Sequence, residues 1–558
     1  MHSYIRPNQF VAIQLPSDQT RLIQLVPNSL VQLGKYGSFA ANQIIGRPFY
    51  YTFEIQDTAD SDGYKLRVVS ATELHAETLI EEAEADGEGD DQETGAGVPM
   101  RTNRQIVDDA STQTLTLQEI EELKKEAGGA GKEIVAKLLE SHTALDQKTA
   151  FSLAKYTLRK RKKYIKRFTV LPLDVSTLAN YMLAQRDAGR TMELRDEHIG
   201  LLGCLGNVHH SGESTVDALP AVKQNGRYLV VDETGGLVVA AMAERMGILY
   251  PHDEEDQEDE EVDDQSATTN VNKGDGEAQN TYPIPPRRRP RPMSADGNTI
   301  TVVHAYSQPN LSLLKYFGYD TNQPDEKHPL HTHLKSITWL QLLDPTSDPI
   351  LANQPSVMPA EELAAAKASK RTAYYFKRNR YERVKQVTKE TREGGFDGLV
   401  VATLLEPPSI MKNLVPLLSG SAPISIYSPT IESLVVLVDL YSTARRTAFI
   451  NRKRELEAQK NSDEDTIDMS SLFDEFELDP TQILPPTLHR TRVRAWQVLP
   501  GRTHPLMTGR GGAEGYLFHA IRVIPTAQNI QAAGTFRKKR KLEATSTPAS
   551  DRDVEMTS

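Results

Sequence analysis

One stretch, residues 227–247, constrains the fold of this chain more than any other. It reads RYLVVDETGGLVVAAMAERMG, a β-branched apolar run that ends in two carboxylates and two glycines and then continues with helical periodicity. This pattern predicts a strand, a tight turn and a helix, the first unit of a doubly wound α/β sheet. In such sheets a ligand lies at the carboxyl end of the first strand, where glycines let it approach the backbone.

The turn in this stretch is a poor match to a working cofactor site. It carries Asp232, Gly235 and Gly236, but the bulky Leu237 follows where a third small residue would admit a cofactor. The second strand ends in His304 without the carboxylate that usually binds ribose hydroxyls. The sequence therefore predicts a degenerate turn, no cofactor and no catalytic residues in this chain.

The region after the fourth predicted strand offers few polar groups that could orient a substrate. It reads Ala-Thr-Leu-Leu-Glu-Pro-Pro over residues 402–408, so only Glu406 is available, and capping a helix is the commoner role for such a residue. Loss of cofactor binding explains these departures together.

The regular alternation of strands and helices spans residues 221–535. After the first unit, strands are expected at 299–305, 336–343, 398–403 and 423–427, helices at about 310–317, 360–392, 409–418 and 430–454, and two final strands at 488–499 and 515–524. Five β/α units closed by an antiparallel hairpin are the plan of class I methyltransferases. The hairpin 488–524 is a candidate subunit interface, because edge strands invite pairing.

Residues 1–80 predict a small β-barrel of closely spaced strands at 10–15, 20–26 and 49–55. Within it, Gly34–Ser38 lacks the spacing of a phosphate-binding loop and is interpreted as a hairpin turn.

Charge is unevenly distributed along the chain. The net charge is −12, but the tracts 81–93, 253–264 and 461–480 hold eight, ten and eight carboxylates and no Lys or Arg, which leaves +14 on the remainder. Blocks of like charge stay solvated. Segments 81–105, 251–297, 461–480 and 536–558 are therefore expected to be disordered, and the folded part to be basic and suited to a polyanion.

Residues 106–220 predict a helical connector whose third helix, about 144–168, is strongly cationic. Two basic clusters with interleaved aromatic residues are candidate RNA contacts, with a solvated helix face as the alternative. The candidate residues are Lys155, Arg159, Lys160, Arg161, Lys162, Lys163, Lys166 and Arg167 in the connector, and Lys377, Arg378 and Arg380 further on.

The remaining motifs are weaker. His328, His331 and His333 are interpreted as a surface loop because no second ligand cluster accompanies them, so no metal site is predicted. The single cysteine, Cys204, excludes an internal disulfide. No apolar run reaches membrane-spanning length, so no membrane association is expected. The basic run 537–541 resembles a nuclear localisation signal.

Several ordered motifs resemble the non-catalytic, RNA-binding subunit family of the eukaryotic tRNA (adenine-58-N1)-methyltransferase. They are Gly34–Phe39 with 45–48, the predicted helix 115–124, Lys155-Tyr156, Gly235–Val238 with 244–247, Tyr316–Tyr319, and His504-Pro505 followed by Gly515–Leu517. The resemblance implies an N-terminal barrel and a methyltransferase-like domain without cofactor. It also implies a catalytic partner that binds S-adenosylmethionine, assembly with two copies of each subunit, tRNA as substrate and a nuclear location.

Two alternatives remain open from the residues. The chain could be an active RNA methyltransferase with an unusual cofactor turn, or a scaffold that holds a catalytic subunit without touching RNA.

Overall fold

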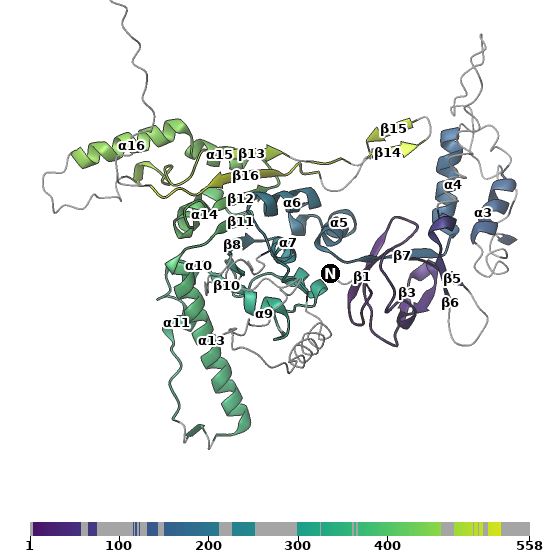
Figure 1. Ribbon diagram of the computed structural model, residues 1–558, viewed down its shortest axis with the longest axis horizontal. Coiled ribbons are helices and arrows are strands. Elements are labelled where there is room, and N and C mark those ends of the chain that lie inside the picture. The colour runs from purple at the N-terminus through teal and green to yellow at the C-terminus, as the bar shows by residue number, and fades with distance from the viewer. Residues whose placement is uncertain are drawn as a thin grey trace, which may run out of the picture. The chain divides into compact units, whose positions relative to one another are not determined.

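A computed structural model gives the fold of the chain (Figure 1). It describes residues 4–56, 65–74, 131–142, 150–210, 226–250, 298–323, 325–359, 366–458, 474–490, 492–494, 496–499, 502–505 and 512–525, with a few isolated positions between them. The predicted linker 81–105, the insertion 251–297 and the basic tail lie outside the described residues, as does most of the predicted helix 115–123.

The largest sheet has seven strands in the spatial order β10-β9-β8-β11-β12-β16-β13. These strands are β8 (Arg227–Asp232), β9 (Thr299–His304), β10 (Leu334–Thr338), β11 (Gly398–Ala402), β12 (Pro423–Ser428), β13 (Thr487–Arg490) and β16 (Tyr516–Ile521). The pairings from β10 to β12 are parallel, and β16 runs antiparallel to both of its neighbours. This order confirms the predicted doubly wound α/β plan with a terminal antiparallel pair.

Helices cover both faces of this sheet because the strands are apolar on both sides. Successive residues of β8 point to opposite faces, so Val230 belongs to one core cluster and Leu229 and Val231 belong to the other. The first cluster includes α5 (Val175–Gln185), α6 (Asp196–Leu205), α7 (Leu237–Met246) and the 3₁₀ segment η7 (Ser312–Phe317); the second includes α14 (Pro407–Leu414) and α15 (Glu432–Leu440).

Four predicted elements of this domain differ from the expectation. The predicted strand 488–499 is divided between β13 and β14 (Trp496–Leu499), which belong to different sheets. The predicted strand 336–343 stops at Thr338, which caps α10 (Trp339–Leu343) through a reciprocal capping box with Gln341. The predicted helix 430–454 is two helices, α15 and α16 (Thr443–Ala458). The predicted helix 310–317 is the 3₁₀ segment η7.

The remaining helices of the α/β domain are short, with one exception. They are α9 (Pro329–His333), α11 (Pro349–Ala352), α13 (Ala368–Glu393) and the 3₁₀ segments η6 (Gly189–Thr191) and η8 (Val415–Leu417). The exception is α13, which has 26 residues and is the long helix in Figure 1.

A second, five-stranded antiparallel sheet has the order β2-β1-β7-β5-β6. Its strands are β1 (Phe10–Gln14), β2 (Thr20–Gln24), β5 (Thr52–Gln56), β6 (Lys65–Val69) and β7 (Arg167–Pro172). The N-terminal unit is therefore not confined to residues 1–80, because its central strand β7 comes from the predicted connector. Within the described residues β2 and β6 do not pair, so closure into a barrel stays a prediction.

The predicted hairpin turn at Gly34–Ser38 is confirmed. Strands β3 (Leu30–Gln32) and β4 (Ser38–Ala40) pair with each other, and the 3₁₀ segment η1 (Gly34–Tyr36) joins them. A further 3₁₀ segment, η2 (Ala41–Gln43), follows β4.

Two helices of the predicted connector, α3 (Gly131–Glu140) and α4 (Ala150–Tyr164), lie between β6 and β7 in the chain. None of the helices in the described part of the chain combines the length and apolar character needed to cross a membrane.

Candidate functional site

The turn between β8 and α7 has the backbone that the sequence predicts. Gly235 and Gly236 have φ angles of 77° and 92°, in the left-handed region where glycine is favoured. Gly236 occupies the N-cap position of α7. The two glycines thus allow the chain to leave the strand and enter the helix within four residues.

The carboxylate of Asp232 is engaged within this turn. It accepts hydrogen bonds from Thr234 N at 2.7 Å, Thr234 Oγ1 at 2.6 Å and Val239 N at 3.0 Å. Burial raises the pKa of Asp232, while these hydrogen bonds lower it. Since three donors converge on the group, we assign it as the carboxylate that satisfies the first turn of α7.

The neighbouring carboxylate, Glu233, connects the turn to the end of β11. Its Oε2 accepts hydrogen bonds from Thr403 Oγ1 at 2.5 Å and from Leu404 N at 3.0 Å. Glu406, the one acid after β11 that the sequence offered, lies at the N-cap position of α14 but makes no side-chain capping bond there. Both acids of the turn are therefore occupied in holding the sheet edge together.

Two leucines pack against the glycine turn and cover it. Leu313 N donates a hydrogen bond to Gly235 O at 3.0 Å, and a Cβ atom on Gly236 would lie 3.0 Å from Leu311 Cα. Both leucines are buried. Leu237, the bulky residue that the sequence placed after the glycines, is buried in the same core cluster as these two leucines and is the first residue of α7.

The space that remains at the ends of β8 and β9 is small. A cavity of about 70 Å³ lies there, lined by Asp232, His304, Tyr306, Trp339, Leu405 and five neighbours. Pockets for ligands of cofactor size occupy about 300–1,000 Å³. His304 stands where an acid for ribose is expected, and its burial lowers its pKa. The cavity at this edge is therefore smaller than a ligand of cofactor size requires.

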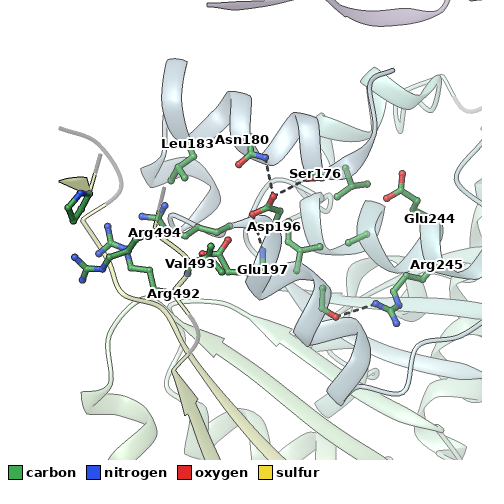
Figure 2. Close-up of a pocket in the computed structure, with 16 residues that line it drawn as sticks. Ser176, Asn180, Leu183, Asp196, Glu197, Glu244, Arg245, Arg492, Val493 and Arg494 are labelled. Carbon is green, nitrogen blue, oxygen red and sulfur yellow. Dashed lines mark hydrogen bonds between the residues drawn. The ribbon is translucent and has the colours of Figure 1, made fainter. Parts of the chain in front are cut away.

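A larger cavity of about 840 Å³ lies between α5, α6 and α7 and the segment Arg492–Arg494 (Figure 2). Its acids already have partners: Asp196 accepts hydrogen bonds from Ser176 and Asn180, and Glu197 accepts one from Val493 N. Charged residues of both signs line it. No sequence motif marks this cavity, because the residues that line it come from separate segments of the chain.

The cations of α4 differ in how they are placed. Arg159 and Lys163 are exposed, and Lys160 and Arg161 are half-buried, while the side chains of Lys155 and Lys162 lie outside the described residues. Lys166 is half-buried and lies two residues beyond the end of the helix. Lys160 Nζ lies 4.9 Å from the centroid of the Tyr156 ring, a cation–π contact. Exposed and aromatic-supported cations on one helix are compatible with phosphate binding.

Arg167 does not belong to this basic helix. It is the first residue of β7, is buried, and forms ion pairs with Glu73 at 2.9 Å and Glu54 at 3.7 Å. The prediction that it lies on the cationic helix face is wrong, because the helix ends at Tyr164 and the chain then enters the sheet.

The second basic cluster lies on α13, where Lys377, Arg378 and Arg380 are all exposed. Arg378 Nη1 donates a hydrogen bond to Tyr374 Oη at 3.4 Å. The two predicted clusters thus fall on different helices. Neither cluster is next to the glycine turn in sequence, and neither lines one of the two cavities described above.

Two of the three histidines have structural roles. His328 is buried and caps α9 by accepting from Leu330 N, and His333 Nδ1 contacts Asn298 O at 2.6 Å. The interpretation of a surface loop is therefore wrong for His328. No group of metal-ligating side chains occurs among the described residues.

Comparison with known proteins decides the family. The model described as the Gcd10p family matches residues 4–367. The chain belongs to the Gcd10p family. An Aspergillus fumigatus protein named tRNA (adenine(58)-N(1))-methyltransferase non-catalytic subunit trm6 is 61% identical over the full length of both chains. The Schizosaccharomyces pombe protein of that name is 30% identical over 98% of this chain and 97% of its own.

Other family members are more distant. The Mus musculus non-catalytic subunit TRM6 is 34% identical over 27% of this chain and 28% of its own. Among solved structures, the tRNA (m1A58) methyltransferase TrmI from Aquifex aeolicus has 8% identity over 94% of this chain and all of its own, with a TM-score of 0.35. That structural similarity is too low to support an argument, so the fold rests on the strand order. The names of these relatives confirm the prediction of a non-catalytic subunit.

Proposed function

We propose that this chain is the tRNA-binding subunit of a methyltransferase complex that forms 1-methyladenosine at position 58, in the T-loop arm of tRNA. The observation that carries the proposal is the glycine turn covered by Leu311 and Leu313, in a chain that retains the strand order of the enzyme fold. A catalytic paralogue would supply the S-adenosylmethionine site, and this chain would bind none.

RNA contact by α4 is part of the proposal. Its exposed or half-buried cations Arg159, Lys160, Arg161 and Lys163 lie on one 15-residue helix. Lys155, Lys162 and Lys166 extend the same sequence run, and Lys377, Arg378 and Arg380 form the second contact on α13. Buried Arg167 is left out of this set.

Assembly with the catalytic subunit would use the hairpin of β14 (Trp496–Leu499) and β15 (Arg502–Pro505). These two strands form a sheet of their own, and Trp496 and Val498, two residues apart on one face, are 58% and 73% exposed. An isolated two-stranded hairpin is marginally stable in water. Coverage of its apolar face by a partner chain would stabilise it. Two copies of each subunit in a nuclear complex complete the proposal.

The test is tRNA binding by the complex of this chain with the catalytic subunit, measured over a series of salt concentrations. Replacing Lys160, Arg161 and Lys163 together by alanine should weaken binding and reduce the slope of log affinity against log salt by about one for each phosphate that the helix no longer binds. The charge-matched control replaces three cations of α16, the exposed Arg445 and Arg454 and the half-buried Lys453, which are not part of the proposed contact. An unchanged slope in the α4 variant would show that this helix does not bind tRNA.

A further inference from the structure

The N-terminal part of α13, residues 368–380, is called here the outer half of the helix. It contains no buried side chain, and Tyr374 alone within it is half-buried. The buried residues of α13 are Tyr381, Val387, Thr388 and Thr391, all in the C-terminal half. A hydrogen bond from Met358 N to Tyr374 Oη, 3.1 Å long, connects the outer half to the preceding segment. Packing therefore does not account for the residues on the outer half.

The charge of this region is strongly one-sided. Residues 367–385 carry eight Lys and Arg residues and a single acid, Glu382. Lys377, Arg380 and Arg383 recur every three residues, so they are neighbours on the helix surface and repel one another. Among the described residues, Lys377 and Arg380 form no salt bridge. A row of like charges lowers the stability of an isolated helix, but it interacts favourably with a polyanion.

Two aromatic side chains lie among these cations. Phe376 is 71% exposed and Tyr375 is 48% exposed. Arg371 and Arg378 lie four residues before and three residues after Tyr375, and Arg380 lies four residues after Phe376, so each ring has a guanidinium beside it on the helix surface. A cation binds a phosphate, whereas an exposed aromatic ring offers a face on which a base can stack.

Unpaired RNA fits this combination better than a double helix. Within a duplex the base faces are stacked on one another, and proteins reach mainly its phosphates and sugars. In loops and single strands the bases can be splayed out and stacked on aromatic or arginine side chains. If the helix bound phosphates alone, the arginines would make the contacts and the two aromatic rings would stay exposed to water.

We propose that the outer half of α13 binds unpaired nucleotides of the RNA substrate, with Tyr375 and Phe376 stacking on bases while Arg371, Arg378 and Arg380 hold the phosphates. The inference rests on the proposed function in taking tRNA as that RNA, and it deepens it by assigning α13 to a loop or single-stranded part of the tRNA.

The test uses the full chain assembled with its catalytic subunit and three labelled probes. These are an unmodified tRNA transcript, a single RNA strand of about 12 nucleotides, and a duplex of the same length. Binding is followed by fluorescence anisotropy across a salt series. The variant is Tyr375→Ala with Phe376→Ala, since alanine preserves helix propensity. Tyr50→Ala, which removes a 68% exposed ring on the N-terminal unit, is the matched control.

The double variant should lose at least about fivefold in affinity for the single strand and for tRNA. Its affinity for the duplex and its salt slope should stay unchanged, because no charge is removed. A variant with Lys377, Arg378 and Arg380 replaced by alanine should instead lower the salt slope with all three probes. Tyr50→Ala should leave every affinity unchanged.

Different failures have different meanings. If the wild-type complex does not bind tRNA, the proposed function is contradicted. If the complex binds tRNA and the double variant retains full affinity for the single strand, the assignment of α13 alone is overturned. Loss of assembly with the catalytic subunit in sedimentation, or loss of binding to anionic lipid vesicles with RNA binding intact, would overturn it in favour of a protein or membrane contact.

Discussion

At the scale of single residues, Gly236 tests whether the glycine turn is covered. Its φ of 92° disfavours any other residue, and a Cβ there would lie 3.0 Å from Leu311 Cα. Gly236→Ala should therefore combine backbone strain with overpacking and lower the free energy of unfolding by about 2–4 kcal/mol. Urea unfolding of the purified chain measures this cost.

Gly46 is the matched control for that substitution. Its φ is 80°, and a Cβ there would meet nothing within 4 Å. Gly46→Ala should cost only the backbone strain, about 1–2 kcal/mol. Equal losses in the two variants would mean that Leu311 does not press on the turn, and the account of the covered turn would be wrong.

The side chain of His304, which lines the small cavity, should make the free energy of unfolding depend on pH. Burial lowers the pKa of His304 in the folded chain below the value of about 6.5 expected when unfolded. Below that pH the unfolded chain takes up a proton that the folded chain does not, so this contribution is present at neutral pH and is lost as the pH falls. The free energy of unfolding of wild type should therefore fall more steeply from pH 7.5 to 5.5 than that of His304→Gln.

The difference between the two slopes is limited to about 1.4 kcal/mol per pH unit, the value for one proton. Chemical denaturation at several pH values measures it. Parallel slopes in wild type and variant would contradict the assignment of a neutral, buried imidazole at this position.

At the scale of elements, one basic run of the sequence is divided between α4, whose cations are proposed to bind RNA, and β7, whose first residue stabilises the fold. Arg167→Gln should lower the free energy of unfolding by about 2 kcal/mol, because it removes a buried guanidinium that pairs with Glu73 and Glu54. Arg159→Gln, on the exposed helix, should leave stability within about 0.5 kcal/mol of wild type. Thermal unfolding of both variants checks the contrast, and equal costs would contradict the boundary between the two elements.

The same boundary shows what sequence could and could not predict. The strand, turn and helix at 227–247 could be predicted, because β-branched residues, two glycines and helical spacing follow one another in the sequence. The end of α4 could not be predicted, because Arg167 and Phe168 continue the helical spacing, whereas their pairing with β5 places them in a strand. Thr338 likewise ends β10 through a capping box that the apolar run obscured.

The sequence predicted the backbone of the glycine turn but not the residues that pack against it. The poor glycine turn and the missing acid after β9 were visible in sequence, and both hold in the structure. The covering residues Leu311 and Leu313 could not be identified, because they approach Gly235 and Gly236 through a contact about 75 residues away in sequence, across the insertion 251–297. A short apolar run followed by Gly318 was the only local signal.

At the scale of the whole molecule, the β14–β15 hairpin makes assembly testable apart from RNA binding. Trp496→Ser with Val498→Ser removes two exposed apolar side chains, so the fold of the isolated chain should be retained. Association with the catalytic subunit should weaken at least about tenfold if these residues lie at the centre of the interface. Sedimentation of the mixed subunits measures it.

Val357→Ser is the control for this variant, because Val357 is 70% exposed and lies outside the hairpin. It should assemble like wild type. An unaltered association constant in the hairpin variant would move the interface elsewhere on the chain.

Cofactor binding by the separate subunits tests the central claim most directly. Leu311 and Leu313 cover the turn, and about 70 Å³ remains beside it. Isothermal titration of the purified chain with S-adenosylmethionine should therefore give no saturable heat, whereas the catalytic subunit titrated in the same buffer should. Saturable binding to this chain, at one cofactor per chain, would contradict the claim that its glycine turn is filled by its own leucines.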